Sequence, residues 1–312
     1  MKPPQLLDGR LKIRHLTLVD ALAEHGSVVR AADHLRITQP AATRSLRELE
    51  EIIGARLFDR GPRGITATTV GSAVVEHARA VLGHLRQASR HVVELNDADR
   101  GTVTVGTHLA GANLLVPRAI ARLKRDHPEL TVVVREDRLS VLHEDLLAGR
   151  LDLVVGRLGP TAAPSPLTQE CLYDEPIRLV VRAGHAALGG HAPLSALAAH
   201  PWVFPLPGTG LRRELEDAFV HERVALPVDR VDCDSILTLR QLVLETEAVA
   251  ALPALVAEED DRFAVLPTKL PGVRLSVGVT LPAERPSGPA TSAFLAHLHD
   301  VGACLLACAD SR

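Results

Sequence analysis

The stretch that decides the fold of the N-terminal region is GSVVRAADHLRITQPAATRSLRELEEIIGARLFDRGPRGIT, residues 26–66. Ser27 is a good N-cap for a helix that runs to about Leu35. Thr38 caps a second helix, with Pro40 in its first turn, where a missing N–H costs little. A glycine-bounded hairpin rich in arginine follows. Two short helices joined by a tight turn and followed by a wing form a layout that places one helix in a DNA major groove.

The second helix has two distinct faces. Helical spacing of its apolar residues predicts a buried stripe made of Ala42, Leu46, Leu49 and Ile53. Thr43 and Arg44 point away from this stripe, and Gln39 lies at the N-terminal tip. Side chains of these types fit the edges of bases. A solvated polar face is the alternative for an isolated amphipathic helix, but the small-residue helix before it and the wing after it favour DNA contact.

The N-terminal residues resemble a known family. Residues 11–96 are similar to the LysR-type transcriptional regulators, which carry an N-terminal winged helix-turn-helix. The resemblance rests on Gly26-Ser27, Arg30-Ala31-Ala32, Leu35, Thr38-Gln39-Pro40-Ala41, Arg44, Leu49-Glu50, Gly54, Leu57-Phe58-Asp59-Arg60 and Gly64-Ile65-Thr66. Ala42 departs from the pattern, because a larger aliphatic residue is usual there.

The resemblance implies two kinds of DNA contact from residues 1–67, the expected winged helix-turn-helix domain. The implied base contacts come from Gln39, Pro40, Thr43 and Arg44. The implied phosphate contacts come from Thr38, Arg60 and Arg63. This division is physically reasonable, because a helix N-terminus and mobile arginines suit phosphates, whereas side chains along the groove-facing surface suit bases.

Residues 68–96 predict one long linker helix, because they contain no proline and little glycine. Alternating steps of four and three give an apolar seam of Val74, Ala78, Val81, Leu85, Ala88 and Val92. A one-sided stripe on a helix roughly 40 Å long indicates a dimer seam, with packing on its own domain as the alternative. Two helix-turn-helix domains paired in this way would bind the two half-sites of an inverted repeat. The LysR resemblance implies a homodimer that pairs into a homotetramer.

Residues 101–312 predict an α/β body in which strands and helices alternate. The strands are continuous apolar runs, which indicates a parallel sheet. The expected elements are strands at 102–106, 130–135, 151–156, 176–182, 202–204 and 228–233, and helices at 114–126, 140–148, 212–222, 236–245 and 291–306.

Two breaks in this pattern divide the body into two lobes. The Pro- and Gly-rich segment 158–166 predicts a crossing to a second lobe, and a break near 266–271 predicts the return. The expected boundaries are about 101–160 and 268–312 for lobe I, and about 165–266 for lobe II. Such a two-lobed body is similar to a periplasmic binding protein and to the LysR effector domain. Residues 149–158 resemble the family branch that regulates sugar-related or aromatic-acid catabolism.

A small-molecule effector is expected between the lobes, where strand C-termini meet helix N-termini. Exposed N–H groups, hydroxyls and helix dipoles suit a carboxylate, such as a small organic acid or a sugar-related metabolite. The ligand-contacting candidates are Thr107, His108, Ser140, Arg157 and Thr209. Ordinary helix capping is the alternative for each of these segments.

Charge is unevenly distributed along the chain. The net charge is −3, yet residues 1–96 hold 14 Lys and Arg against ten Asp and Glu, which gives +4 there and −7 for the remainder. This asymmetry suits a DNA-binding end joined to a non-binding body. Only 2% of the residues are aromatic, which leaves few stacking platforms for single-stranded nucleic acid.

Composition and motifs argue against several other classes. No apolar run is long enough for a membrane span, and no signal peptide is recognisable, so we expect a cytoplasmic protein. The 15 histidines show no metal-ligand spacing, and nucleophile-elbow and P-loop motifs are absent from the sequence. The sequence therefore predicts neither an enzyme nor a metal or cofactor site. We expect Cys171, Cys233, Cys304 and Cys308 to be packing thiols.

The partners implied by this interpretation are double-stranded DNA, a small-molecule effector, further copies of the chain and RNA polymerase. One alternative stays open. Residues 101–312 alone would fit a cytoplasmic solute-binding or sensor protein whose helix-turn-helix-like region mediates protein interaction.

Overall fold

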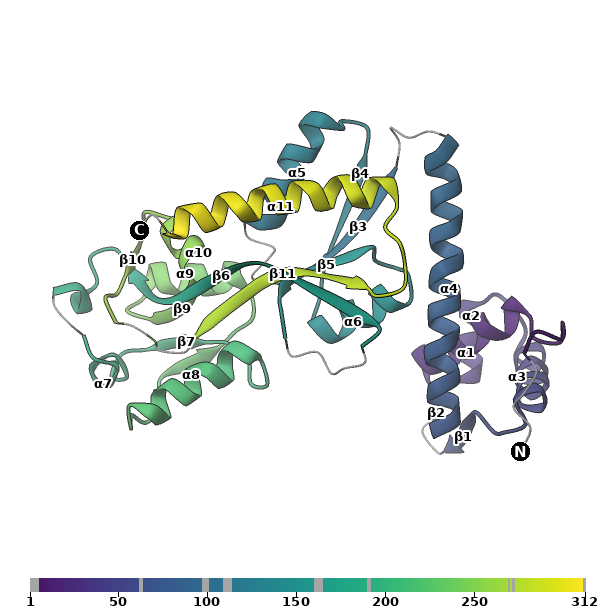
Figure 1. Cartoon of the computed structure of the whole chain (residues 1–312). Helices are drawn as coiled ribbons and strands as arrows, with labels where there is room; N and C mark the ends of the chain where they lie inside the picture. Colours follow the sequence, from purple (N-terminus) through teal and green to yellow (C-terminus); the bar gives the residue numbers. More distant parts are fainter. Residues whose placement is uncertain are drawn as a thin grey trace.

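We analysed a computed structural model of the 312-residue chain. The structure describes residues 6–61, 64–96, 101–108, 114–159, 165–189, 192–268, 270 and 273–310. Figure 1 shows an N-terminal domain, one long helix and an elongated body that follow one another along the chain. We call residues 6–67 the reader and residues 101–310 the body.

The reader is built on three helices and a short hairpin. They are α1 (Ile13–His25), α2 (Val28–His34), α3 (Gln39–Ile53), β1 (Phe58–Gly61) and β2 (Gly64–Ala67). The Ser27 side chain caps α2 by accepting from the Arg30 N–H, and Thr38 caps α3 by accepting from the Ala41 N–H. Both caps satisfy N–H groups that a helix start leaves without a partner.

The reader core contains the stripe that helical spacing predicts. Ala42, Leu46 and Leu49 are buried, whereas Ile53 is half-buried at the edge of the core. The hairpin is attached to the helices by close backbone contact, because the Ile65 N–H donates to the Gly26 carbonyl at 3.0 Å. A Cβ atom at Gly64, where φ is +129°, would lie 2.2 Å from that carbonyl oxygen. Glycine is therefore required at the base of the wing.

The long helix α4 (Thr69–Asn96) belongs to the reader in its first half only. Val75 and Ala78 are buried in the reader core, while Val81, Leu85 and Val92 are 43–59% exposed. The expectation of one continuous intermolecular seam is therefore wrong at Ala78, because α1 covers this part of the helix. The exposed apolar side chains of the expected seam lie after Ala78.

The body is one mixed sheet with helices on both faces. In the described residues the strand order is β4-β3-β5-β11-β6-β9-β7-β8, and β10 pairs with β6. The strands are β3 (Thr102–Thr107), β4 (Thr131–Glu136), β5 (Leu153–Arg157), β6 (Leu167–Arg182), β7 (Trp202–Phe204), β8 (Arg230–Asp232), β9 (Val249–Pro253), β10 (Phe263–Val265) and β11 (Arg274–Pro282).

Most of the body helices lie where the sequence predicts a helix. They are α5 (Leu115–Asp126), α6 (Leu139–Leu147), α7 (Leu194–Leu197), α8 (Gly210–His221), α9 (Ile236–Glu245), α10 (Ala254–Glu258) and α11 (Pro289–Asp310), with a 3₁₀ turn at Ala186–Gly189. In lobe I, α5 and α11 pack together along the sheet, and the apolar side chains of α6 form a separate cluster with Leu151 and Val154. α8 and α9 likewise join two different clusters in lobe II.

The two lobes are connected through a pair of long strands. β6 pairs with β11 from Leu167 to Pro176 and with β9 from Ile177 onward. The chain therefore changes lobes inside β6, so the expected boundary near residue 165 does not coincide with the change of partner. The crossing expected at 158–166 lies largely outside the described residues, because residues 160–164 are not described.

The prediction of an α/β body is confirmed, but the sheet is only partly parallel. β3 is parallel to both β4 and β5, as the apolar runs predict, whereas β11 is antiparallel to β5 and β6.

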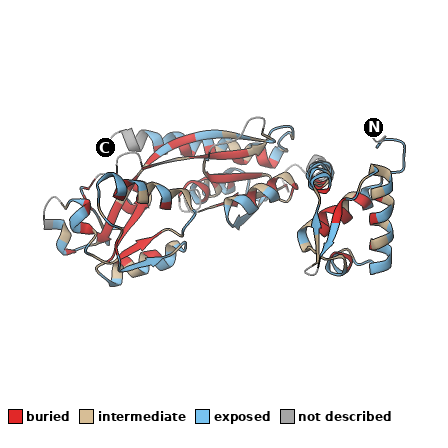
Figure 2. Cartoon of the chain, turned by 90° about the horizontal axis from the view of Figure 1, so that it is seen from below, coloured by how far each residue is buried: buried red, intermediate tan, exposed pale blue. Residues whose placement is uncertain are grey.

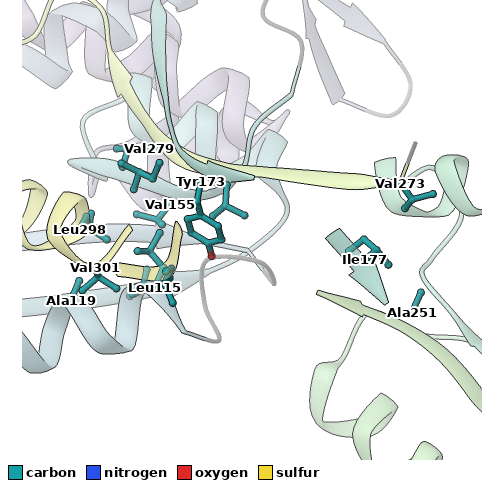
Figure 3. Close-up of a cluster of buried hydrophobic side chains, with 14 of the residues drawn as sticks. Leu115, Ala119, Val155, Tyr173, Ile177, Ala251, Val273, Val279, Leu298 and Val301 are labelled. Atoms are coloured by element: carbon teal, nitrogen blue, oxygen red, sulfur yellow. The ribbon is translucent and has the colours of Figure 1, made fainter. Parts of the chain in front are cut away.

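Buried residues form one group in the reader and another in the body (Figure 2). The largest cluster continues from lobe I into lobe II. Figure 3 shows Leu115, Val155 and Leu298 of this cluster around Tyr173, with Ile177 of β6 and Ala251 of the neighbouring strand β9 farther away. The largest cluster of the body is therefore shared by both lobes, and the reader has a core of its own.

Candidate nucleic-acid interface and ligand site

The residues predicted to contact bases lie on the N-terminal half of α3. Figure 1 shows α3 on the side of the reader away from the body. Gln39, Pro40 and Arg44 are exposed, and Thr43 is half-buried beside them. Because Ala42 and Leu46 fix the opposite face in the core, these four side chains face solvent together.

Two of the three glutamates of α3 have partners within the reader, and the third, Glu51, is exposed. Glu50 accepts from the Leu57 N–H at 2.8 Å, and Glu48 pairs with Arg14 at 3.2 Å. By contrast, among the described residues Arg44 and Arg47 form no ion pair. The N-terminal half of α3 therefore presents the positive charge of Arg44 and Arg47, and the exposed Glu51 lies one turn beyond Arg47.

The backbone-contact candidates surround this face. Thr38 is exposed at the N-cap of α3, where helix N–H groups and the dipole favour a phosphate. Arg60 is exposed on β1, opposite Ile65 of β2. Arg63, the other predicted phosphate contact, lies outside the described residues.

Two of the ligand-contacting candidates, Arg157 and Thr209, lie where the lobes meet, and His108 lies on the adjoining edge of lobe I. Arg157, at the end of β5 in lobe I, forms an ion pair with Glu214 on α8 in lobe II. The Arg157 guanidinium lies against Gly210, where a Cβ atom would be 2.9 Å from Nη1. Thr209 caps the same helix start, accepting from the Arg212 N–H at 3.3 Å and donating to the Leu206 carbonyl at 2.9 Å. His108 lies beside Gly156, with its carbonyl oxygen 3.4 Å from where a Cβ atom would stand.

Thr107 is placed differently from the other candidates. It is 1% exposed, and its hydroxyl donates to the Val155 carbonyl at 3.0 Å, so it joins β3 to β5. Ser140 is exposed in the first turn of α6. Its neighbour Leu139 approaches the Cβ position of Gly156 to 4.0 Å. The structure thus gathers Arg157 and Thr209 closely and leaves Ser140 at the periphery.

Glu214 is a residue that the sequence-based search missed. Its side chain is 28% exposed, and its Oε2 and the Nη1 of Arg157 are buried without hydrogen-bond partners. Buried polar atoms without partners are uncommon and mark a place where another group can bind. The signal in the sequence was weak, because Glu214 reads as one more surface carboxylate on an amphipathic helix.

Other types of site find little support in the described part of the chain. No group of three or more His, Cys, Asp and Glu side chains there could hold a metal ion. Burial raises the pKa of the Cys171 thiol, which disfavours the reactive thiolate. Cys233 and Cys304 are free thiols, and the side chain of Cys308 is not described. None of the described helices combines the length and apolar character that a bilayer crossing needs.

Comparison with known proteins gives a consistent family. Residues 13–72 match the bacterial regulatory helix-turn-helix proteins of the lysR family, and residues 96–303 match the LysR substrate binding domain. The regulator GbpR of Rhizobium radiobacter is 35% identical over 247 residues, covering 78% of this chain and 82% of GbpR. The regulator PcaQ of Agrobacterium fabrum is 32% identical over 290 residues, covering 91% and 93%.

Solved structures show the same fold at lower identity. A full-length OxyR variant from Pseudomonas aeruginosa superposes with a TM-score of 0.64 at 23% identity, covering 94% of each chain. Full-length CbnR in complex with its target DNA superposes with a TM-score of 0.54 at 22% identity, covering 94% of this chain and 100% of CbnR. Sequence and fold agree, and the chain belongs to the LysR family of DNA-binding transcriptional regulators, with an N-terminal helix-turn-helix domain and an effector-binding domain.

Proposed function

We propose that the N-terminal half of α3 reads base edges in the major groove through Gln39, Pro40, Thr43 and Arg44. Thr38, Arg60 and Arg63 then hold the DNA backbone. The observation that carries this proposal is the contrast on α3, within the described residues, between the exposed Arg44, which forms no ion pair, and the carboxylates of Glu48 and Glu50, which are bonded within the reader. Base contacts specify a sequence, whereas phosphate contacts set register and orientation.

Replacing Arg44 by alanine tests the base-reading role. A duplex selected by the wild-type protein from a random library serves as cognate DNA, and a scrambled duplex serves as the comparison. Arg44→Ala is expected to weaken cognate binding by about 1–3 kcal/mol and to leave scrambled binding nearly unchanged. Arg60→Ala is the matched control and should weaken binding to both duplexes alike. Equal losses on both duplexes for Arg44→Ala would show that Arg44 contacts the backbone only.

The second half of α4 supports pairing of two chains. Val81, Leu85 and Val92 expose apolar surface along one helix face. Two chains joined at this face would present two copies of α3 to the two halves of an inverted repeat. We infer a homodimer as the DNA-binding unit, and two such dimers in a tetramer. RNA polymerase is the partner through which a DNA-bound regulator of this kind acts, and the cytoplasm is where it meets bacterial DNA.

The contact between the lobes supports an anionic effector. Arg157 is the positive group there, the N-terminus of α8 adds a positive dipole end, and Glu214 provides the only carboxylate seen paired with Arg157 in the described residues. A small organic acid or sugar acid would compete with Glu214 for the guanidinium. Arg157, Thr209 and His108 are its proposed contacts, with Ser140 at the periphery. Thr107 is proposed as a support of this edge through its bond to Val155.

A further inference from the structure

The linker helix α4 rests on lobe I through two glycines. Gly83 of α4 faces Gly149, which follows α6 with φ at +70°. A Cβ atom at Gly83 would lie 2.9 Å from the Leu147 carbonyl oxygen, and one at Gly149 would lie 2.5 Å from the Cα of Gly83. The backbones of the linker and the body therefore touch, and any larger residue at either position would separate them.

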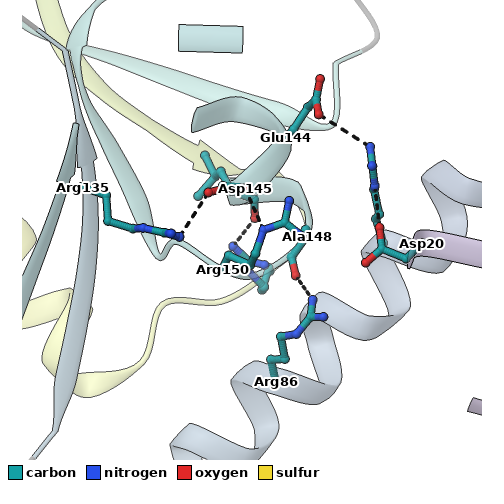
Figure 4. Close-up of polar contacts among 10 residues, drawn as sticks. Asp20, Arg86, Arg135, Glu144, Asp145, Ala148 and Arg150 are labelled. Carbon is teal, nitrogen blue, oxygen red and sulfur yellow. Dashed lines mark hydrogen bonds and ion pairs between the residues drawn. The ribbon is translucent and has the colours of Figure 1, made fainter. Parts of the chain in front are cut away.

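Arginines from two sides hold the same end of α6. Arg86 of α4 donates to the Ala148 carbonyl, and Arg285 donates to the carbonyls of Leu146 and Leu151 at 2.8 and 3.1 Å. The last carbonyls of a helix lack helical partners and carry the negative end of its dipole. The end of α6 is thus an acceptor site that the linker helix fills with Arg86 (Figure 4).

One further arginine joins the three parts of the molecule. Arg79 of α4 donates to Asp20 of α1 at 2.9 Å, and its other side lies 3.9 Å from Glu144 of α6. Asp20 is nearly buried, whereas Glu144 is 60% exposed. Arg79 is therefore fixed to the reader and only loosely attached to the body.

No hydrophobic cluster of the described residues spans the junction, although Leu82 beside Gly83 is buried. Val75 and Ala78 of α4 belong to the reader core. A shallow hollow lined by Gln87, Asp152 and Arg285 adjoins the junction. Small polar contacts between domains permit relative motion, in contrast to large apolar ones.

We propose that Gly83, Arg86 and Arg79 form a reversible clamp that docks the linker helix, and with it the reader, onto the end of α6. α6 begins at Leu139, beside Gly156 and the proposed effector contacts, and ends at the clamp. One rigid helix thus connects the two places. The link to the effector rests on the proposed function, whereas the docking itself does not.

The clamp is tested first without DNA or ligand. Fluorophores are attached at Glu51 on α3 and Arg125 on α5, in full-length protein whose four cysteines are replaced by serine. Labelled chains are diluted into excess unlabelled chains, so that energy transfer reports distances within one chain. Gly83→Leu should lower the transfer efficiency and broaden its distribution, because the leucine blocks backbone contact while it raises the helix propensity of α4. Arg86→Ala should produce a smaller change in the same direction.

Ala73→Leu is the matched control, because Ala73 is exposed on the same helix and the substitution places the same leucine side chain away from the junction. It should keep the transfer of the parent protein. Far-ultraviolet circular dichroism of each variant verifies that α4 stays helical. Unchanged transfer in a folded Gly83→Leu protein would overturn the clamp.

DNase I footprints on the selected duplex test the consequence for the reader. Gly83→Leu should keep the contact to one half-site and change the spacing to the second. If transfer falls while the footprint is unchanged, the clamp does not position the reader, and this part of the proposal is overturned. A protein that selects no DNA sequence would contradict the proposed function, while the fluorescence result would still decide the clamp.

Discussion

Glu175 is a carboxyl group in the core of the body. It is 3% exposed on β6, and its Oε1 accepts from the Leu255 N–H at 2.7 Å. Burial, with a smaller contribution from the Glu258 carboxylate, raises its pKa to about 7 against the opposing effect of the Leu255 N–H. The folded protein therefore holds a proton on Glu175 that the unfolded chain, with a pKa near 4.5, releases at lower pH.

This residue makes the stability of the body pH-dependent. Its contribution is fully present below pH 4.5 and is lost as the pH rises through about 7, up to about 3 kcal/mol. Glu175→Gln keeps an acceptor for Leu255 and carries no charge. The variant should unfold at a higher temperature than the wild type at pH 8 and at a similar temperature at pH 5, as measured by calorimetry.

The exposed Glu136 on β4 provides the control, because Glu136→Gln should leave the difference between pH 5 and pH 8 unchanged. Burial lowers the pKa of His15 and His143, so the protein loses the stability that each neutral histidine contributes as the pH falls below about 6.5. They act alike in wild type and variant, and the comparison isolates Glu175. Parallel pH curves for wild type and Glu175→Gln would refute a protonated carboxyl.

Single residues differ in how far the sequence determines their burial. Helical spacing predicts Ala42, Leu46 and Leu49 in the core, because this spacing follows from local geometry. Helical spacing does not apply to Glu175, whose burial follows from its place between Tyr173 and Ile177, at steps of two on a buried face of a strand. A buried charged residue depends on neighbours far away in the chain, and Leu255 is one of these.

At the scale of elements, α4 changes its role along its length. Its first half completes the reader core through Val75 and Ala78, and its second half exposes Val81 and Leu85. Periodicity alone predicts a single apolar seam along α4. It does not distinguish a face covered by the same chain from a face covered by a second chain. The contact with α1 decides this for the first half.

The exposed half of α4 predicts the effect of a charge on assembly. Leu85→Asp should weaken the dimer by at least about 2 kcal/mol, roughly thirtyfold in its dissociation constant, because an unpaired carboxylate would be buried between two helices. Sedimentation velocity over a concentration series measures this. Ser72→Asp, exposed on the same helix but off the seam, should leave the dimer intact. Dimers of unchanged strength in Leu85→Asp would place the interface elsewhere.

β6 shows which elements a sequence pattern finds and which it misses. The apolar run after Pro176 was predicted, whereas residues 167–175 were not. That first half pairs with β11, about a hundred residues farther along the chain. Its alternation of polar and apolar residues acquires meaning only when that partner is known, because strand formation depends on the neighbouring strand.

At the scale of the whole molecule, the Arg157–Glu214 pair links lobe I to lobe II. If an anionic effector displaces Glu214 from Arg157, substitutions at these two residues should have opposite effects on effector binding. Glu214→Gln should bind a carboxylate up to about tenfold more tightly, about 1.4 kcal/mol, because the internal competitor loses its charge. Arg157→Gln should abolish the binding.

Thermal shift with benzoate, succinate and gluconate, and with glucose as the uncharged control, measures this prediction. The double variant Arg157→Gln/Glu214→Gln separates loss of binding from the cost of an unpaired Glu214. Stabilisation by glucose equal to that by gluconate, or carboxylate binding that survives in Arg157→Gln, would exclude this site for an anion.

The separate cores of reader and body have a consequence for domain exchange between related regulators. A graft at residue 67 would cut the reader away from Val75 and Ala78, which complete its core. A graft at residue 96 would move Gly83 and Arg86 with the reader and require a glycine and a free carbonyl from the new body. Deleting one residue of α4 between Ala78 and Gly83 would turn the reader by about 100° relative to the body. Exchangeable parts of this protein are therefore defined by the phase of one helix as well as by domain borders.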